Sequence, residues 1–323
     1  MTNKEIYQKT LTFSVRRLLF DLGGFLLLGI LAVGGFYLME KLNDKGLVGL
    51  GIGIVIGIIV LIVLFRYVSY TYKAGQIAMM TKAVTEGGLP QDVLGEGKAI
   101  VKARFTTVAI FFAVTRAIKA IFNQLARGLN AVGRAVGGDS GGSVADVISS
   151  AISVVVGYLC DCCLGWIFYR KDQNAAKAAC EGAVLFFKHG KTLLKNLGRV
   201  FGLGLLSLLV IGGVFFGIFY AIFSAFPAGF ATLAQEIAKN ASTSESGVVT
   251  AMGDPHTLML IAAGLAAVIL WGILHSTFVR PFVLVGVLRN YMESGMNDIP
   301  TEESFNMLDS KSARFRKLHA EGI

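Results

Sequence analysis

Charged residues, proline, histidine and cysteine are all scarce in this 323-residue chain, and each scarcity narrows what it can be. Only 16% of the residues are charged, against about 25% in soluble domains. In contrast, 54% are hydrophobic and the mean hydropathy is +0.65. Five prolines and 39 glycines favour long, closely packed helices with few kinks. The composition therefore excludes an ordinary soluble domain and indicates membrane-spanning helices.

The short motifs of common enzyme classes are also absent from the sequence. It contains no P-loop, no His-x-Glu pairing, no Gly-x-Ser-x-Gly and no dinucleotide-binding fingerprint. The four histidines lie far apart in sequence. We therefore predict that the chain is not an enzyme, holds no metal and needs no cofactor.

The net charge of +9 does not indicate nucleic acid as a partner. The lysines and arginines flank apolar runs, where positive charge orients a membrane protein and attracts anionic lipid. We predict the lipid bilayer and anionic lipids as partners, with no nucleic acid, and a location in the plasma or cell membrane.

The apolar runs predict an all-α fold, a polytopic integral membrane helical bundle of about six transmembrane helices. Its N and C termini are predicted to be cytoplasmic. Residues 1–17 form a cytoplasmic segment, 18–279 the transmembrane domain and 280–323 a cytoplasmic tail. The predicted spans are 18–39, 46–68, 105–124, 144–168, 201–226 and 257–279.

The third of these spans is ambiguous, because residues 105–136 carry a basic stripe at helical spacing. Such a helix either lies flat in the membrane surface or crosses the membrane with its stripe facing the bundle interior. If it crosses, 23 lysines and arginines lie inside, five outside and two within the membrane; if it lies flat, the split is 15 to 15. Positive residues favour the cytoplasmic side, so we predict that it crosses. The stripe consists of Arg116, Lys119, Asn123, Arg127, Asn130 and Arg134.

One carboxylate, Asp161, falls inside the fourth predicted span, where an isolated charge is costly. Arg116 and Lys119 of the preceding span are its candidate partners. Near the start of the first span, Asp21 is expected to pair with Arg17.

Three of the four cysteines surround that carboxylate, and a metal site is one interpretation of them. Two of them would diverge on a helix, and no histidine pair stands nearby, whereas structural zinc uses two ligand pairs. Buried packing thiols or acylation sites fit better. The four cysteines are Cys160, Cys162, Cys163 and Cys180.

Glycine recurs every fourth residue in the second predicted span, at Gly49, Gly53 and Gly57. Gly213 and Gly217 repeat this spacing once in the fifth. Such smooth faces let helix backbones approach closely in lipid. The pattern predicts helix packing, either within one subunit or between subunits of a homo-oligomer.

The second half of the chain resembles choline-transporter-like proteins. The resemblance is carried by Cys160-Asp161-Cys162-Cys163-Leu164-Gly165-Trp166 followed by Asn174-Ala175-Ala176, by Leu193-Leu194-Lys195-Asn196-Leu197-Gly198-Arg199-Val200, and by a last span leaving through 285–297 toward Glu303-Ser304-Phe305-Asn306-Met307. It does not cover the first half, and that family usually has more spans. It implies transport of a choline-like cation or a related lipid headgroup.

Two functional hypotheses follow from these observations. In the first, the chain is a transporter or channel for a small polar or charged solute. Spans three and four line its path, with Arg116, Lys119, Asn123 and Arg127 on one side and Asp161 on the other. A basic lining favours anions or zwitterions. In the second, the chain is a non-transporting oligomeric scaffold or a subunit of a larger membrane assembly.

Overall fold

The structure, a computed structural model, describes residues 1–43, 45–105, 113–121, 123–124, 142–194, 197–241 and 253–322. Most residues of these ranges are helical and none lies in a strand, so the predicted all-α class is confirmed. The chain divides into two compact units, each built from segments far apart in sequence. Unit 1 comprises Met1–Val15, Thr71–Gly202 and Arg280–Ile323, and unit 2 comprises Arg16–Tyr70 and Leu203–Val279.

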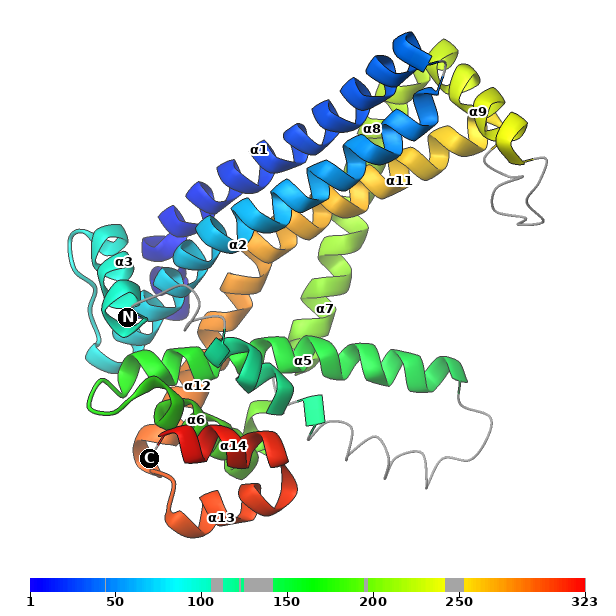
Figure 1. The fold of residues 1–323 in the computed structure, drawn as a ribbon. Coiled ribbons are helices and arrows are strands. Elements are labelled where there is room, and N and C mark those ends of the chain that lie inside the picture. Colours follow the sequence, from blue (N-terminus) through cyan, green and yellow to red (C-terminus); the bar gives the residue numbers. More distant parts are fainter. Residues whose placement is uncertain are drawn as a thin grey trace. The chain divides into compact units, whose positions relative to one another are not determined.

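Long helices dominate the first half of the described chain, and shorter ones the second (Figure 1). Residues 113–121 add one further helical stretch. Two five-residue segments, η1 and η2, have π-helical geometry. The elements are α1 (Asn3–Asn43), α2 (Gly46–Glu86), α3 (Val93–Arg104), α5 (Gly142–Tyr169), α6 (Ala175–Leu194), α7 (Leu197–Ser207), η1 (Leu208–Gly212), α8 (Gly213–Ser224), α9 (Pro227–Ala241), α11 (Pro255–Leu274), η2 (His275–Val279), α12 (Arg280–Asn297), α13 (Glu302–Lys311) and α14 (Ala313–Gly322).

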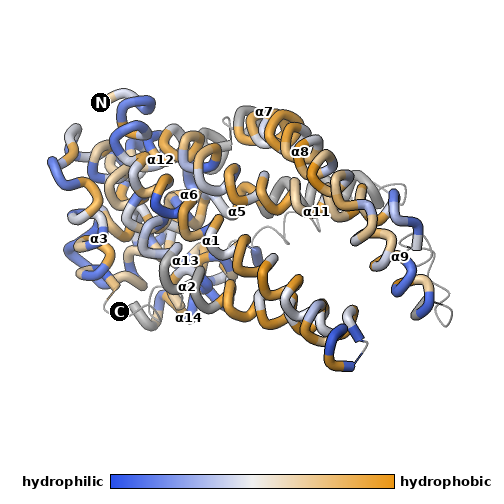
Figure 2. The backbone as a smooth tube through the Cα atoms, turned by 90° about the horizontal axis from the view of Figure 1, so that it is seen from above, coloured by the Kyte–Doolittle hydropathy of each residue, from blue (hydrophilic) through white to orange (hydrophobic). Residues whose placement is uncertain are grey.

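Unit 2 exposes large apolar side chains along most of its helices. In α1, only 6% of the most apolar 18-residue stretch is buried, and Leu19 and Ile30 are 66% and 68% exposed. Figure 2 shows α7 and α8 as hydrophobic along nearly their whole length. Among the described residues, three helices are long and apolar enough to cross a membrane: Asn3–Asn43, Val200–Ser224 and Pro255–Asn297. These helices agree with a membrane protein, because bare apolar surface on this scale is unfavourable in water.

The glycine face of α2 lies against α1 inside unit 2, where the two helices run side by side (Figure 1). A Cβ atom added at Gly49 would meet the backbone oxygen of Gly35 and lie 2.6 Å from Cβ of Met39. At Gly53 it would lie 2.8 Å from the carbonyl carbon of Leu31, and at Gly57 2.6 Å from Cδ1 of Leu28. Glycine is therefore required here by backbone-to-backbone contact within one chain.

Unit 1 has a dense interior in which aromatic and small residues interlock. Phe13 is fully buried, and its ring fills the space that a side chain at Gly75 or Gly97 would need. Gln76 Nε2 donates a hydrogen bond of 3.0 Å to Ser14 Oγ, which ties the same elements together. This contact set joins the first turns of α1 to the second half of α2 and to α3.

A second part of that interior lies among α5, α6 and α12, which pack against one another. The buried Trp166 ring meets Tyr291 edge-on at 6.4 Å, and its Nε1 donates to Glu181 Oε2 at 3.0 Å. Tyr291 donates to the carbonyl oxygen of Gly182 at 2.6 Å. The described apolar part of α5, Val154–Tyr169, is therefore the centre of a protein core.

A substitution of Gly49 tests the α1–α2 contact. We expect Gly49→Leu to force the two helices apart and to lower the free energy of unfolding by about 1–3 kcal/mol, the usual cost of overpacking. The measurement is the thermal or denaturant midpoint of the purified protein in detergent. Gly51→Leu is the matched control, because a Cβ at Gly51 has nothing within 4 Å. Equal midpoints for the two variants would contradict the contact.

Candidate functional site

The strongest charge cluster of unit 1 is centred on Asp161, which is buried in α5. Its Oδ1 lies 2.6 Å from Lys73 Nζ, and its Oδ2 accepts a hydrogen bond of 2.6 Å from Arg280 Nη2. The Asp161 side chain is 5% exposed, whereas those of Lys73 and Arg280 are 35% and 29% exposed. One carboxylate thus joins α2, α5 and α12 through two cations.

Gly157 and Tyr158, one turn before Asp161, form the space in which the Arg280 side chain lies. Arg280 lies over the Tyr158 ring at 5.3 Å, a cation–π contact. A Cβ at Gly157 would lie 3.1 Å from Arg280 Nη2, so glycine provides the room for the guanidinium. The Nε of Arg280 is buried without a hydrogen-bond partner. These contacts hold the Arg280–Asp161 ion pair in place, and they resemble a structural clamp between helices more than an open binding site.

The partners of Asp161 differ from those that the sequence suggested. We expected Arg116 or Lys119, on the assumption that residues 105–124 and 144–168 were neighbouring spans. Among the described residues, the ion pairs of Asp161 are with Lys73 and Arg280. Lys73 and Arg280 lie just beyond the ends of the predicted spans 46–68 and 257–279. Their positions beside long apolar helices were a signal, but nothing in the sequence linked them to Asp161.

The basic stripe lies on the outside of unit 1 in the part that the structure describes. Arg116, Lys119 and Asn123 are exposed, while Val114 and Ile118 on the opposite face are buried. Arg127 and the rest of the stripe lie outside the described residues. The structure therefore brings none of these three side chains to Asp161 by a described ion pair.

The four cysteines are free thiols inside the core of unit 1. Cys163 Sγ lies 3.7 Å from the hydroxyl of Tyr291, and Cys162 and Cys180 are fully buried. Burial raises the pKa of the Cys180 thiol to about 12, so it stays protonated and unreactive. Of the two interpretations that the sequence favoured, packing thiols match this burial, whereas acylation would need access that the folded chain does not give.

A different polar cluster lies within the apolar helices of unit 2, at Ser207 and His275. Ser207 Oγ is 2.9 Å from His275 Nδ1, accepts from Trp271 Nε1 at 3.1 Å and donates to the carbonyl oxygen of Gly204 at 2.7 Å. Since a hydroxyl has one proton, Ser207 cannot donate to Gly204 and to His275 together. When Ser207 donates to Gly204, the contact with His275 requires Nδ1 to be the donor, so the tautomer of His275 is linked to the hydrogen bonds of Ser207.

Both residues of this pair stand where an α-helix changes to π-helix. Ser207 directly precedes η1, and His275 is the first residue of η2. A π-helical segment widens the helix and frees backbone groups from their usual partners, and such segments occur frequently at functional sites. The sequence gives no signal for this pair, since a single serine or histidine in an apolar helix carries no pattern.

Further polar groups of unit 2 lie in η2 and where the unit 2 part of α1 begins. Arg17 Nε is 3.4 Å from Asp21 Oδ2, so the predicted Arg17–Asp21 pair is confirmed. Arg17 also donates to the backbone oxygen of Ser276 at 3.2 Å, and Thr277 Oγ1 donates to Asp21 at 3.5 Å. We call Ser207, Trp271 and His275, together with Arg17, Asp21, Ser276 and Thr277, the inner polar cluster of unit 2.

The remaining predicted packing glycines face open space. A Cβ at Gly213 or Gly217 on α8 would have nothing within 4 Å. Their face is therefore not used for contact within the described chain.

Comparison of the chain with family models, with curated proteins and with solved structures gives no match.

Neutralising Asp161 tests the role of the charge cluster. Asp161→Asn keeps the shape but leaves Lys73 and Arg280 without their counter-charge, and we expect a loss of about 3 kcal/mol in the free energy of unfolding, as for other broken buried pairs. Denaturant unfolding in detergent, followed by tryptophan fluorescence, measures it. Asp172→Asn is the control, because Asp172 is 64% exposed in its pair with Arg170 and exposed pairs contribute little. A similar small loss in both variants would count against the cluster as a clamp.

Proposed function

We propose that the chain is an integral membrane transporter that crosses the bilayer four times through unit 2 and moves a small polar solute past the inner polar cluster. The observation that carries the proposal is the Ser207–His275 pair between two π-helical segments of otherwise apolar helices. Polar and ionisable side chains are costly within a membrane and usually line a path or bind a solute there.

The division of the chain supports four crossings. Unit 2 contains two stretches, Arg16–Tyr70 and Leu203–Val279, and each leaves unit 1 and returns to it. If each stretch is a membrane hairpin, all segments of unit 1 lie on one side. That arrangement places 27 of the 30 lysines and arginines on the inner side and only Lys41, Lys45 and Lys239 outside. The bias is stronger than the 23 to 5 of six crossings, and it takes Arg116 and Lys119 out of the membrane.

The burial of α5 supports the same arrangement. Residues of a span that faces lipid are exposed in the isolated chain, as in α1. In α5, Trp166 and Ile167 are fully buried and Val156 is only 3% exposed. An apolar run of this kind suits a protein core as well as a bilayer, so 144–168 need not cross. Six crossings remain the alternative, in which both 105–124 and 144–168 span.

The chemistry of the inner polar cluster suits a solute with both donors and acceptors. It contains a cation, a carboxylate, hydroxyls and an imidazole, from α1, α7 and η2. Histidine is also a usual member of proton relays in transporters, which makes proton flux a second quantity to measure. The resemblance to choline-transporter-like proteins makes choline the first solute to test.

A second candidate function is that of an oligomeric subunit. It is favoured by the open glycine face of α8 and the bare apolar surface of unit 2. Because Gly49 and Gly53 already contact α1, a contact between subunits would use the Gly213 and Gly217 face.

An epitope inserted after residue 140 in the full-length chain distinguishes four crossings from six. With four crossings it lies inside, so antibody should bind only after the membrane is permeabilised. An epitope after residue 246 lies outside in both arrangements and is the positive control. Binding to the first epitope in intact cells would reject four crossings.

Flux measurements in proteoliposomes test the inner polar cluster. We expect His275→Ala and Ser207→Ala each to reduce the uptake of radiolabelled choline, or proton flux followed by entrapped pyranine, by at least about tenfold, equivalent to roughly 1.4 kcal/mol. His256→Ala is the matched control, since His256 lies at the opposite end of α11 and bonds to Tyr220. If both cluster variants keep wild-type flux, or if the wild type carries none, the transport proposal fails.

A further inference from the structure

Unit 1 contains a basic groove between helical residues 113–121 and α14. The groove takes no part in the transport that we propose for unit 2. It has a volume of about 340 Å³, which lies at the lower end of ligand-binding pockets. Three cations and no acid line it. Its lining residues are Ala113, Arg116, Ala117, Ala120, Arg314, Lys317 and Leu318.

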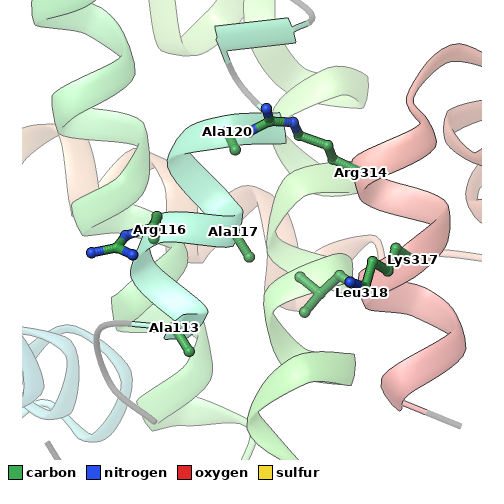
Figure 3. A pocket seen from close by; sticks show the side chains of 7 residues that line it. All are labelled: Ala113, Arg116, Ala117, Ala120, Arg314, Lys317 and Leu318. Atoms are coloured by element: carbon green, nitrogen blue, oxygen red, sulfur yellow. The ribbon is translucent and has the colours of Figure 1, made fainter. Parts of the chain in front are cut away.

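The groove is open because one wall is made of alanines. Ala113, Ala117 and Ala120 recur at helical spacing and lie on one face, and Figure 3 shows Ala117 and Ala120 directed toward α14. Arg314 reaches across from α14 toward Ala120 (Figure 3). Larger side chains at the alanine positions would fill the space that the guanidinium and ammonium groups now border.

The opposite wall, α14, is held in position by its own cap. Phe315 N donates to Ser312 Oγ at 3.1 Å, and the Ser312 hydroxyl donates to Gln124 Oε1 at 2.9 Å. Leu318, buried at 5% exposure, anchors the middle of α14. The two walls are thus tied together at one end, so the groove is a feature of the folded unit.

The first turn of α14 carries no acidic residue. Arg314 lies in that turn, where the backbone N–H groups make the helix end partly positive and carboxylates are normally preferred, and Lys317 follows in the second turn. On the neighbouring α13, Asp309 is engaged by His319 Nδ1 at 2.9 Å and by Arg316 through its backbone oxygen. Among the described residues, none of the three groove cations forms an ion pair with an acid. A bound anion would relieve repulsion among the cations and the helix end together.

We propose that this groove binds a phosphate-bearing anion through Arg314 and Lys317, whereas the Arg116 side chain points away from α14 (Figure 3). Arginine and lysine are the usual partners of phosphate oxygens, and the groove is small enough for one such group. The group is either a free phosphorylated solute or the headgroup of an anionic phospholipid, and the chemistry of recognition is the same. The proposal does not depend on the transport proposed for unit 2.

Binding of pyrophosphate to the purified full-length protein in detergent tests the groove. We expect saturable binding by isothermal titration calorimetry, and a loss of at least tenfold in affinity in the Arg314→Gln/Lys317→Gln double variant. Ala117→Phe, which keeps every charge but fills the space, should lose affinity to a similar extent. Lys102→Gln is the charge control, since Lys102 is exposed on α3 and does not line the groove. Circular dichroism and thermal midpoints identify any variant that fails to fold.

Nanodiscs distinguish the two sources of the phosphate group. If phosphatidylglycerol in place of phosphatidylcholine weakens pyrophosphate binding to the wild type at least tenfold, the natural occupant is a lipid headgroup. If affinity is equal in both, it is a soluble anion. The proposal is overturned if the wild type shows no saturable binding of pyrophosphate. It is also overturned if the folded double variant and Ala117→Phe bind as well as the wild type, or if Lys102→Gln loses as much as they do.

Discussion

The ion cluster at Asp161 is the contact on which the packing of unit 1 depends. Removing a carboxylate from water is costly, and the cost is offset only by close, well-directed partners. Lys73 and Arg280 supply these at 2.6 Å each, and they come from segments that lie far from Asp161 in sequence. The cluster therefore selects one arrangement of α2, α5 and α12, around which the Trp166 and Tyr291 packing is built.

The two units differ in where their apolar and charged side chains lie. Unit 2 presents apolar side chains outward, and the polar groups of its inner polar cluster bond to one another. Unit 1 encloses a core of apolar side chains and exposes charges such as Arg116 and Arg314, whereas Asp161 is buried with its partners. The apolar residues of the sequence thus lie in two places, the exposed surface of unit 2 and the core of unit 1.

Because apolar residues occur both in exposed helices and in a core, the sequence predicts some features of the fold and not others. The all-α class and the Arg17–Asp21 pair were predictable, because helix type and spacing of four residues are local properties. The partners of Asp161 were not, since they depend on which distant helices meet. The apolar run of α5 predicts a span and also fits a protein core, because composition alone does not distinguish a bilayer from a core. The Ser207–His275 pair was not predictable either, because it joins residues that lie 68 positions apart in sequence.

The π-helical segment η2 has a consequence for the polar side chains that it carries. Each residue of an α-helix turns the chain by about 100°, and a π-helical turn holds one residue more than an α-helical turn. The extra residue in 275–279 therefore sets the direction of Thr277, which donates to Asp21, relative to α11 in the same unit. Loss of a single residue before Thr277 would return the segment to α-helix and turn its hydroxyl away from Asp21. The number of residues in η2 is therefore as constrained as the identity of its side chains.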